Sequence, residues 1–164
     1  MGISREKPGP GQESVWDYPR PPRVENYPGV VVLEFGGQEI ARTQRAMRVL
    51  ETSHPPVFYV PQADFAPGTL HQVEGTTWCE FKGAATYYDV VAGSARAERS
   101  AWTYLEPTAG FEQLTGTIAV YPGRMDRCLV DNEVVQAQPG DFYGGWITSK
   151  VVGPFKGAPG TWGW

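Results

Sequence analysis

The chain has 164 residues, of which 41% are hydrophobic and 13% aromatic, enough apolar material for one domain with its own core. Its 20 Gly and 15 Pro exclude long uninterrupted helices over most of the chain, so we expect many short strands joined by frequent turns. The formal net charge of −4 provides no overall positive field for phosphates, and we expect no nucleic-acid partner.

The sequence also limits location and metal binding. No apolar run approaches the roughly 20 residues that cross a bilayer, and the N-terminal segment lacks the apolar stretch of a signal peptide, so we expect a cytoplasmic protein with no membrane partner. Two cysteines, Cys79 and Cys128, do not make a disulfide framework. A four-ligand zinc site would need both cysteines together with His54 and His71. We predict no metal and no cofactor, and the sequence leaves the oligomeric state open.

The chain begins with a segment rich in Gly, Pro and charge. Residues 1–13 show no periodicity, which predicts a disordered tail before a single β domain over 14–164. The prolines in WDYPRPPRVE favour an extended strip on the domain surface. We expect this strip to lay Trp16, Tyr18, Arg20 and Arg23 across another part of the fold.

A hairpin is predicted next. Val30 to Phe35 is a β-branched, apolar run, and Gly36-Gly37 separates it from QEIART, which gives a strand, a tight turn and a strand. Residues 44–51 have helical composition, but eight residues suit a short helix or a strand edge equally well.

Further short strands follow over 57–60, 76–81, 85–91 and 95–103, and in the last of these alternate residues share a face. A second hairpin region is predicted to turn at Pro122-Gly123 and again at Asp131-Asn132. No alternation of strands with helices occurs, so the sheets should be antiparallel. The predicted fold is mostly β, with two antiparallel sheets packed or leaning together, short hairpins and at most one short helix.

The first motif with possible chemistry is ETSHPP. Pro55 keeps His54 out of helical dihedrals and so holds these side chains in a turn. A histidine beside the carboxylate of Glu51 could move protons. The alternative is a purely structural turn in which Glu51 and Thr52 bond to nearby backbone amides and His54 packs beneath the prolines.

The second motif surrounds Cys79. Alternation along a strand would place Glu80 and Lys82 on one face and Cys79 with Phe81 on the other, which separates the thiol from the charges. Cys79 is then more typical of a small buried hydrophobe than of a nucleophile. Lys82 precedes a glycine and could reach a phosphate or carboxylate, although a solvated pair with Glu80 explains it equally well.

Aromatic residues form the third group. Trp102 and Tyr104 share one strand face, where they make either a core stripe or one wall of a pocket for a flat ligand. The C-terminal segments YGGWIT and GPFKG match no phosphate-binding loop, and we interpret them as chiefly structural.

Several ordered motifs resemble one family. They are VWDYPRPPRVE, RVLETSHPPVFYVP, a TxCxxKGxxxYxxV pattern, AWTYLEP, YGGWIT and GPFKG, and together they run from about Trp16 to Trp164. The chain is similar over this length to the bacterial and fungal family called domain of unknown function 427. The resemblance implies a fold like that of the β-tent group, many of whose members hold zinc, and brings a predicted nucleotidyltransferase label.

The residues give that label little support. Nucleotidyl transfer usually needs two or three carboxylates that hold magnesium against a triphosphate, and no clustered acidic motif occurs. The isolated Asp64, Asp89, Asp126 and Asp141 would have to converge in space. The small number of cysteines likewise predicts that this chain does without the zinc of the β-tent group.

The leading hypothesis is a small-molecule site between the sheets. Its polar contacts would be Arg20, Glu51, His54 and Lys82, with Glu51, His54 and Lys82 as catalytic candidates and Lys82 or Arg20 holding an anionic group. Its walls would be Trp78, Trp102, Tyr104 and Trp146. The alternatives are a protein-interaction module, favoured if Trp102 and Trp146 are buried with no pocket nearby, and a metal-dependent nucleotidyltransferase.

Overall fold

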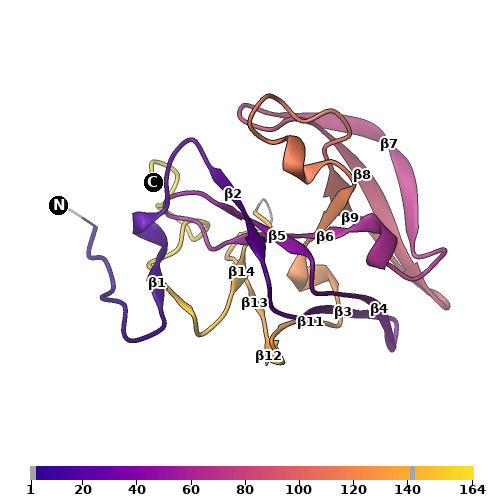
Figure 1. The fold of residues 1–164 in the computed structure, drawn as a ribbon, viewed down its shortest axis with the longest axis horizontal. Helices are drawn as coiled ribbons and strands as arrows, with labels where there is room; N and C mark the ends of the chain where they lie inside the picture. The colour runs from indigo at the N-terminus through magenta and orange to yellow at the C-terminus, as the bar shows by residue number, and fades with distance from the viewer. Residues whose placement is uncertain (1–2, 141–142) are drawn as a thin grey trace.

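The computed structural model describes residues 3–140 and 143–164. The described chain is mostly β, as predicted, and its helical content consists of 3₁₀ turns of three residues each: η1 (Val15–Asp17), η2 (Gln62–Asp64), η3 (Glu112–Leu114) and η4 (Pro122–Arg124). None of the helices in the described residues is both long and apolar enough to cross a membrane. Figure 1 shows the strands grouped into sheets that lean on one another.

The largest sheet has seven antiparallel strands in the order β2-β5-β6-β10-β9-β8-β7. Their bounds are β2 (Arg23–Tyr27), β5 (Ala46–Leu50), β6 (Val57–Pro61), β10 (Thr117–Val120), β9 (Ala95–Thr103), β8 (Gly83–Ala92) and β7 (Leu70–Cys79). The undecided segment 44–51 therefore forms a strand, β5. Ala46, Met47, Val49 and Leu50 are all buried, so both faces of β5 are covered, which explains its nearly continuous run of apolar residues.

A second antiparallel sheet has the order β12-β11-β3-β4. Its strands are β3 (Val31–Phe35), β4 (Gln38–Thr43), β11 (Arg127–Val130) and β12 (Glu133–Val134). The predicted hairpin is confirmed, because β3 pairs with β4 across Gly36 and Gly37, both of which have the positive φ that this tight turn needs. Two small sheets complete the fold: β1 (Glu13–Ser14) with β15 (Val151–Val152), and β13 (Gln136–Ala137) with β14 (Trp146–Ile147).

The hairpin predicted across Pro122-Gly123 is wrong, although the turn itself is present. The chain does turn at Pro122-Gly123, within η4, but β10 and β11 do not pair there, because β10 lies in the seven-stranded sheet and β11 in the four-stranded one. All four residues of β10 are buried, which suits a central strand covered on both faces. The turn at Asp131-Asn132, where both residues have positive φ, does join the paired strands β11 and β12.

The seven-stranded sheet is covered on both faces. We call inner the face that packs against the four-stranded sheet, where Phe58, Val60, Ile118 and Val120 join a cluster with Leu33. We call outer the opposite face, where Tyr59, Trp102, Tyr104 and Ala119 pack with Phe111 and Leu114. In Figure 1 the four-stranded sheet lies along the lower edge, and β7, β8 and β9 rise at the upper right.

The segment predicted as a disordered tail makes several contacts. The Glu6 amide donates to the Gly153 carbonyl, at 2.9 Å, and the Gln12 side chain donates to the Ser149 carbonyl. The Arg5 guanidinium lies 5.3 Å from the centre of the Trp16 ring. The proposed boundary at residue 13 stays a prediction.

Candidate functional site

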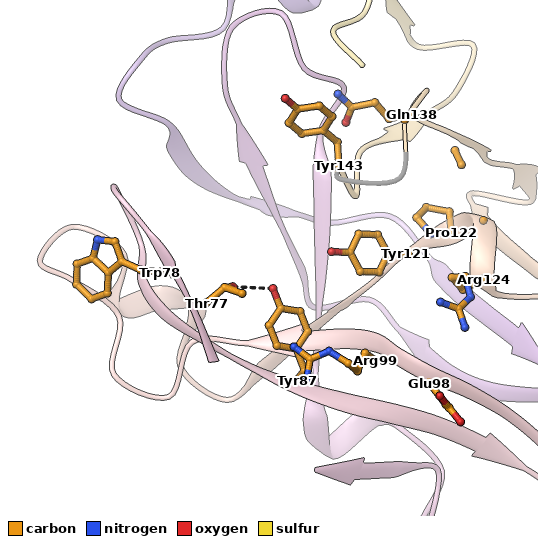
Figure 2. A pocket seen from close by; sticks show the side chains of 13 residues that line it. Thr77, Trp78, Tyr87, Glu98, Arg99, Tyr121, Pro122, Arg124, Gln138 and Tyr143 are labelled. Carbon is orange, nitrogen blue, oxygen red and sulfur yellow. Dashed lines mark hydrogen bonds between the residues drawn. The ribbon is translucent and has the colours of Figure 1, made fainter. Parts of the chain in front are cut away.

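A cleft of about 1000 Å³ opens on the outer face of the seven-stranded sheet. Strands β7, β8 and β9 form one side, and η4 forms the other together with Ala137, Gln138, Gly140 and Tyr143 (Figure 2). The side chains that matter below come from all of these elements: Thr77, Trp78, Tyr87, Glu98, Arg99, Tyr121, Arg124, Gln138 and Tyr143. The wall thus combines aromatic rings with a few polar groups, the usual composition of ligand pockets.

A bulge in β9 aims Arg99 into this cleft. Between the pairs Tyr88↔Ala101 and Val90↔Ala97, β9 has two more residues than β8, and Arg99 takes a φ of 48°. The Asp89 carboxylate stabilises the bulge by accepting the Arg99 backbone N–H at 2.9 Å. The predicted alternation over 95–103 therefore breaks at Arg99, whose guanidinium reaches the outer face.

The Arg99 guanidinium is held in place. It donates to the Glu74 carbonyl at 2.9 Å and lies 4.4 Å from the centre of the Tyr87 ring. Strand β7 has its own bulge, between Gln72 and Thr76, and Gly75 there has a φ of +96°. The Tyr87 hydroxyl shares a 2.7 Å hydrogen bond with the Thr77 hydroxyl, the dashed line in Figure 2. Arg99 and Tyr87 thus form a preorganised wall.

Trp102 lies behind Tyr121. Their ring centres are 4.6 Å apart, and the Trp102 indole N–H donates to the Tyr59 hydroxyl at 3.4 Å. Gly144 is required here, because a Cβ at this position would lie 2.3 Å from Cη2 of Trp102. Burial raises the pKa of Tyr121, so its phenol stays protonated at neutral pH and can donate a hydrogen bond.

The ETSHPP turn lies behind the Gln138 and Tyr143 wall of the cleft. Arg20 Nε donates to Glu51 Oε2 at 3.0 Å, and the same carboxylate oxygen lies 3.8 Å from His54 Nε2. The His54 ring meets the Tyr143 ring edge to face at 5.1 Å. The turn itself is tight, since Ser53 has a φ of 71° and is fully buried. The structure therefore brings Arg20, Glu51 and His54 together.

Hydrogen bonds fix the tautomer of His54. Oε1 of Gln138 accepts the Gly145 N–H at 3.1 Å, so the amide nitrogen faces the other way and donates both to the Lys156 carbonyl and to His54 Nδ1, at 3.2 Å. Nδ1 must then be unprotonated, and Nε2 carries the hydrogen toward Glu51. Burial is the main reason that the His54 pKa falls to about 4, and the charges of Lys156, Arg20 and Lys82 lower it further against the opposing effect of Glu51. His54 is therefore neutral near pH 7.

Lys82 does not lie where strand alternation predicted. Strand β7 ends at Cys79, and Lys82 belongs to the following turn, which returns its ammonium toward the outer face. Its Nζ lies 5.8 Å from the Tyr104 ring centre. Burial by itself lowers the Lys82 pKa, but Tyr59, Cys79 and Glu51 outweigh it and raise the pKa above its ordinary value. The thiol and the ammonium are thus neighbours, a correction to the expected separation.

The aromatic residues predicted as walls occupy different places. Trp78 is 72% exposed at the rim of the cleft, while Trp102 and Tyr104 are buried in the outer-face cluster. Trp146 is only 1% exposed and packs on Phe58 in the inner core, at 4.9 Å between ring centres, so it lies outside the cleft. Trp102 and Trp146 are both buried, yet the cleft lies next to Trp102. An interaction module would be favoured if both tryptophans were buried and no pocket lay nearby. Only the first of these conditions is met.

Sequence reasoning missed much of the cleft. Arg99, Tyr121 and Arg124 belong to no motif that the sequence showed. They come together only through two bulges and through the passage of the chain from one sheet to the other. Tyr143 and Lys156 were assigned only structural roles in YGGWIT and GPFKG. The Lys156 Nζ in fact lies 5.8 Å from the Tyr143 ring centre, next to His54.

Among the described residues, carboxylates do not gather as metal-dependent nucleotidyl transfer would need. Asp64 pairs with Arg45, Asp89 holds the β9 bulge, and Asp126 accepts the Gly37 N–H. Asp141 lies outside the described residues. Over residues 3–140 and 143–164, no three His, Cys, Asp or Glu side chains are grouped so that they could hold a metal ion. The part of the chain that the structure describes therefore does not fit a catalytic magnesium site.

The comparisons with known proteins agree with the motifs. A search of curated proteins finds no match to this chain. One family model, described as Domain of unknown function (DUF427), matches residues 23–131. The matched range holds β2 to β11, and with them Glu51, His54, Lys82 and Arg99, whereas Gln138, Tyr143 and Lys156 follow it. Because this match covers well over half of the chain, the protein belongs to the domain of unknown function 427 family.

Proposed function

We propose that this protein binds a small organic molecule in the cleft on the outer face. The observation that carries the proposal is the cleft itself: about 1000 Å³, bounded by the rings of Trp78, Tyr87, Tyr121 and Tyr143 and by a few polar groups. This volume is at the upper end of the roughly 300–1,000 Å³ typical of small-molecule sites. The fixed Arg99 and Gln138 side chains lower the entropic cost of binding, because they need no rearrangement.

We assign Glu51 and His54 to positioning rather than to proton transfer. A general base needs a free lone pair, and Nδ1 of His54 accepts from Gln138 while its Nε2–H faces Glu51. Arg20 is similarly engaged by Glu51, the Thr52 carbonyl and the main-chain oxygen of Trp164. In this proposal Arg20, Glu51 and His54 hold Gln138 and Tyr143 in position through the contacts of His54 with both residues. Lys82 supplies a positive charge close to the Tyr104 ring.

The test is a screen of metabolite-sized compounds by ligand-observed NMR, followed by a cleft-filling variant. Ala137 is exposed at the cleft wall, so Ala137→Trp should place an indole in the cleft and abolish the signals of genuine ligands. Ala63→Trp, at an exposed alanine of η2 away from the cleft, is the matched control and should leave them unchanged. Signals that persist in Ala137→Trp, or a screen without any, would contradict the proposal.

A further inference from the structure

The arginines of this chain differ in how they are neutralised. Arg20, Arg23, Arg42, Arg45, Arg48, Arg96 and Arg127 each form an ion pair with a carboxylate. Within the described residues, Arg5, Arg99 and Arg124 have no carboxylate within ion-pair distance. Arg5 lies over Trp16, far from the cleft in sequence and fold, whereas Arg99 and Arg124 both line the cleft. Two of these three guanidinium groups thus lie in the same cleft.

The surroundings of these two arginines match a planar anion. Arg99 comes from β9 and Arg124 from η4; Tyr87 lies against Arg99, and Tyr121 lies near both arginines (Figure 2). Glu98 is the one carboxylate among the described residues of the lining, which leaves a net positive charge. Guanidinium groups present paired donors that fit carboxylate, phosphate and sulfonate oxygens, and tyrosine rings accept a flat ring by stacking.

We infer that the cleft selects molecules that carry an anionic group on a planar ring, with Arg99 and Arg124 as the residues that hold the anion. This inference rests on the proposed function and specifies its ligand class. Arg99 supplies a preset guanidinium, because the Glu74 carbonyl and the Tyr87 ring fix it. The Arg124 backbone N–H donates to the Tyr121 carbonyl, but its side chain makes no hydrogen bond or ion pair with the other described residues, so its five guanidinium donors are available to a ligand.

Two dyes with the same ring skeleton test the charge selection. 8-Anilinonaphthalene-1-sulfonate carries a sulfonate, and N-phenyl-1-naphthylamine lacks it. Fluorescence titration of the full chain gives a Kd for each dye. We expect Arg99→Gln and Arg124→Gln each to weaken sulfonate binding roughly tenfold, the loss of one charge-assisted hydrogen bond, with little change for the neutral dye. Arg127→Gln, at an exposed arginine of the other sheet, is the matched control and should change neither Kd.

Two further measurements distinguish the effect of charge on dye binding from the effect of packing. Arg99→Lys keeps the positive charge and should retain part of the sulfonate preference that Arg99→Gln loses. Higher salt should weaken sulfonate binding in the wild type but not in the Arg99→Gln/Arg124→Gln double variant. An unchanged ratio of the two Kd values in both single variants would overturn the anion assignment, even if Ala137→Trp abolishes both dyes. Dye binding that Ala137→Trp does not alter, or no binding of either dye, would overturn the proposed function and this inference with it.

Discussion

The two faces of the seven-stranded sheet carry different side chains and differ in how completely they are closed. The inner face presents Val60, Ile118 and Val120, together with the aromatic Phe58, to a second sheet, and this side is closed. The outer face presents Tyr59, Trp102 and Tyr104, and part of it opens into the cleft. We therefore expect stability to depend chiefly on the inner face, and under our proposal ligand recognition depends on the outer one.

The largest loss of stability should come from removing a large side chain from the core on the inner face. Trp146→Ala should cost about 3–5 kcal/mol of unfolding free energy, because Trp146 is almost fully buried against Phe58. Tyr121→Ala, at a half-buried residue of the outer face, should cost roughly half as much. Chemical denaturation of both variants measures the difference. Equal losses of unfolding free energy in the two variants would contradict the proposed difference between the faces.

A smaller effect is expected where the outer face is most tightly packed. Gly144→Ala would place a methyl group against the buried Trp102 ring, and the strain should cost about 1–3 kcal/mol. Gly123→Ala is the matched control, because its Cβ would lie 3.5 Å from Ala137, an ordinary contact. Thermal unfolding and titration with N-phenyl-1-naphthylamine should both report the displacement of Trp102. A Gly144→Ala variant as stable as Gly123→Ala would contradict the close packing.

His54 should make stability depend on pH. Its pKa is about 4 in the folded chain against 6.5 as the ordinary value, so between these values the unfolded state binds the extra proton. Stability from this group is present above pH 6.5 and is lost as the pH falls toward 4, by roughly 2 kcal/mol at pH 4.5. Denaturation at pH 7 and 4.5 should show this loss in the wild type and in His71→Gln, an exposed control, but not in His54→Gln. Identical pH profiles of the two variants would rule it out.

The smallest effect concerns charge within the cleft. Glu98 is exposed there and has no ion-pair partner among the described residues, so Glu98→Gln should leave the unfolding free energy within about 0.5 kcal/mol of the wild type. Removing its negative charge should tighten binding of 8-anilinonaphthalene-1-sulfonate by a factor of about two to five. Weaker sulfonate binding in Glu98→Gln would contradict the anion preference, and fluorescence titration decides between the outcomes.

Local patterns predicted the strands well but not the way in which they come together. The hairpin of β3 and β4 followed from β-branched residues and two glycines, signals that act within a few residues. The crossing at Pro122 could not be predicted in this way, because the partners of β10 are β6 and β9, which precede it in the chain. A turn between two apolar runs looks the same whether those runs pair or separate.

The candidate site shows the same limit. The ETSHPP motif drew attention to Glu51 and His54, and the structure places Arg20 beside them. Arg99 could not be found, because a bulge shifts side-chain direction without any change in composition. Lys82 was placed on the wrong side for a related reason: alternation holds only within a strand, and β7 ends at Cys79.

The two cysteines of the chain give it a practical property. Cys128 is buried in the inner core, and burial raises the pKa of its thiol, so reagents reach it poorly and find little thiolate there. Cys79 is only partly buried and follows Trp78, which stands at the rim of the cleft. A thiol-reactive fluorophore should therefore attach at one position of the unaltered protein. That position is next in the chain to a rim residue of the cleft, so the label would serve to test the proposed ligand binding there.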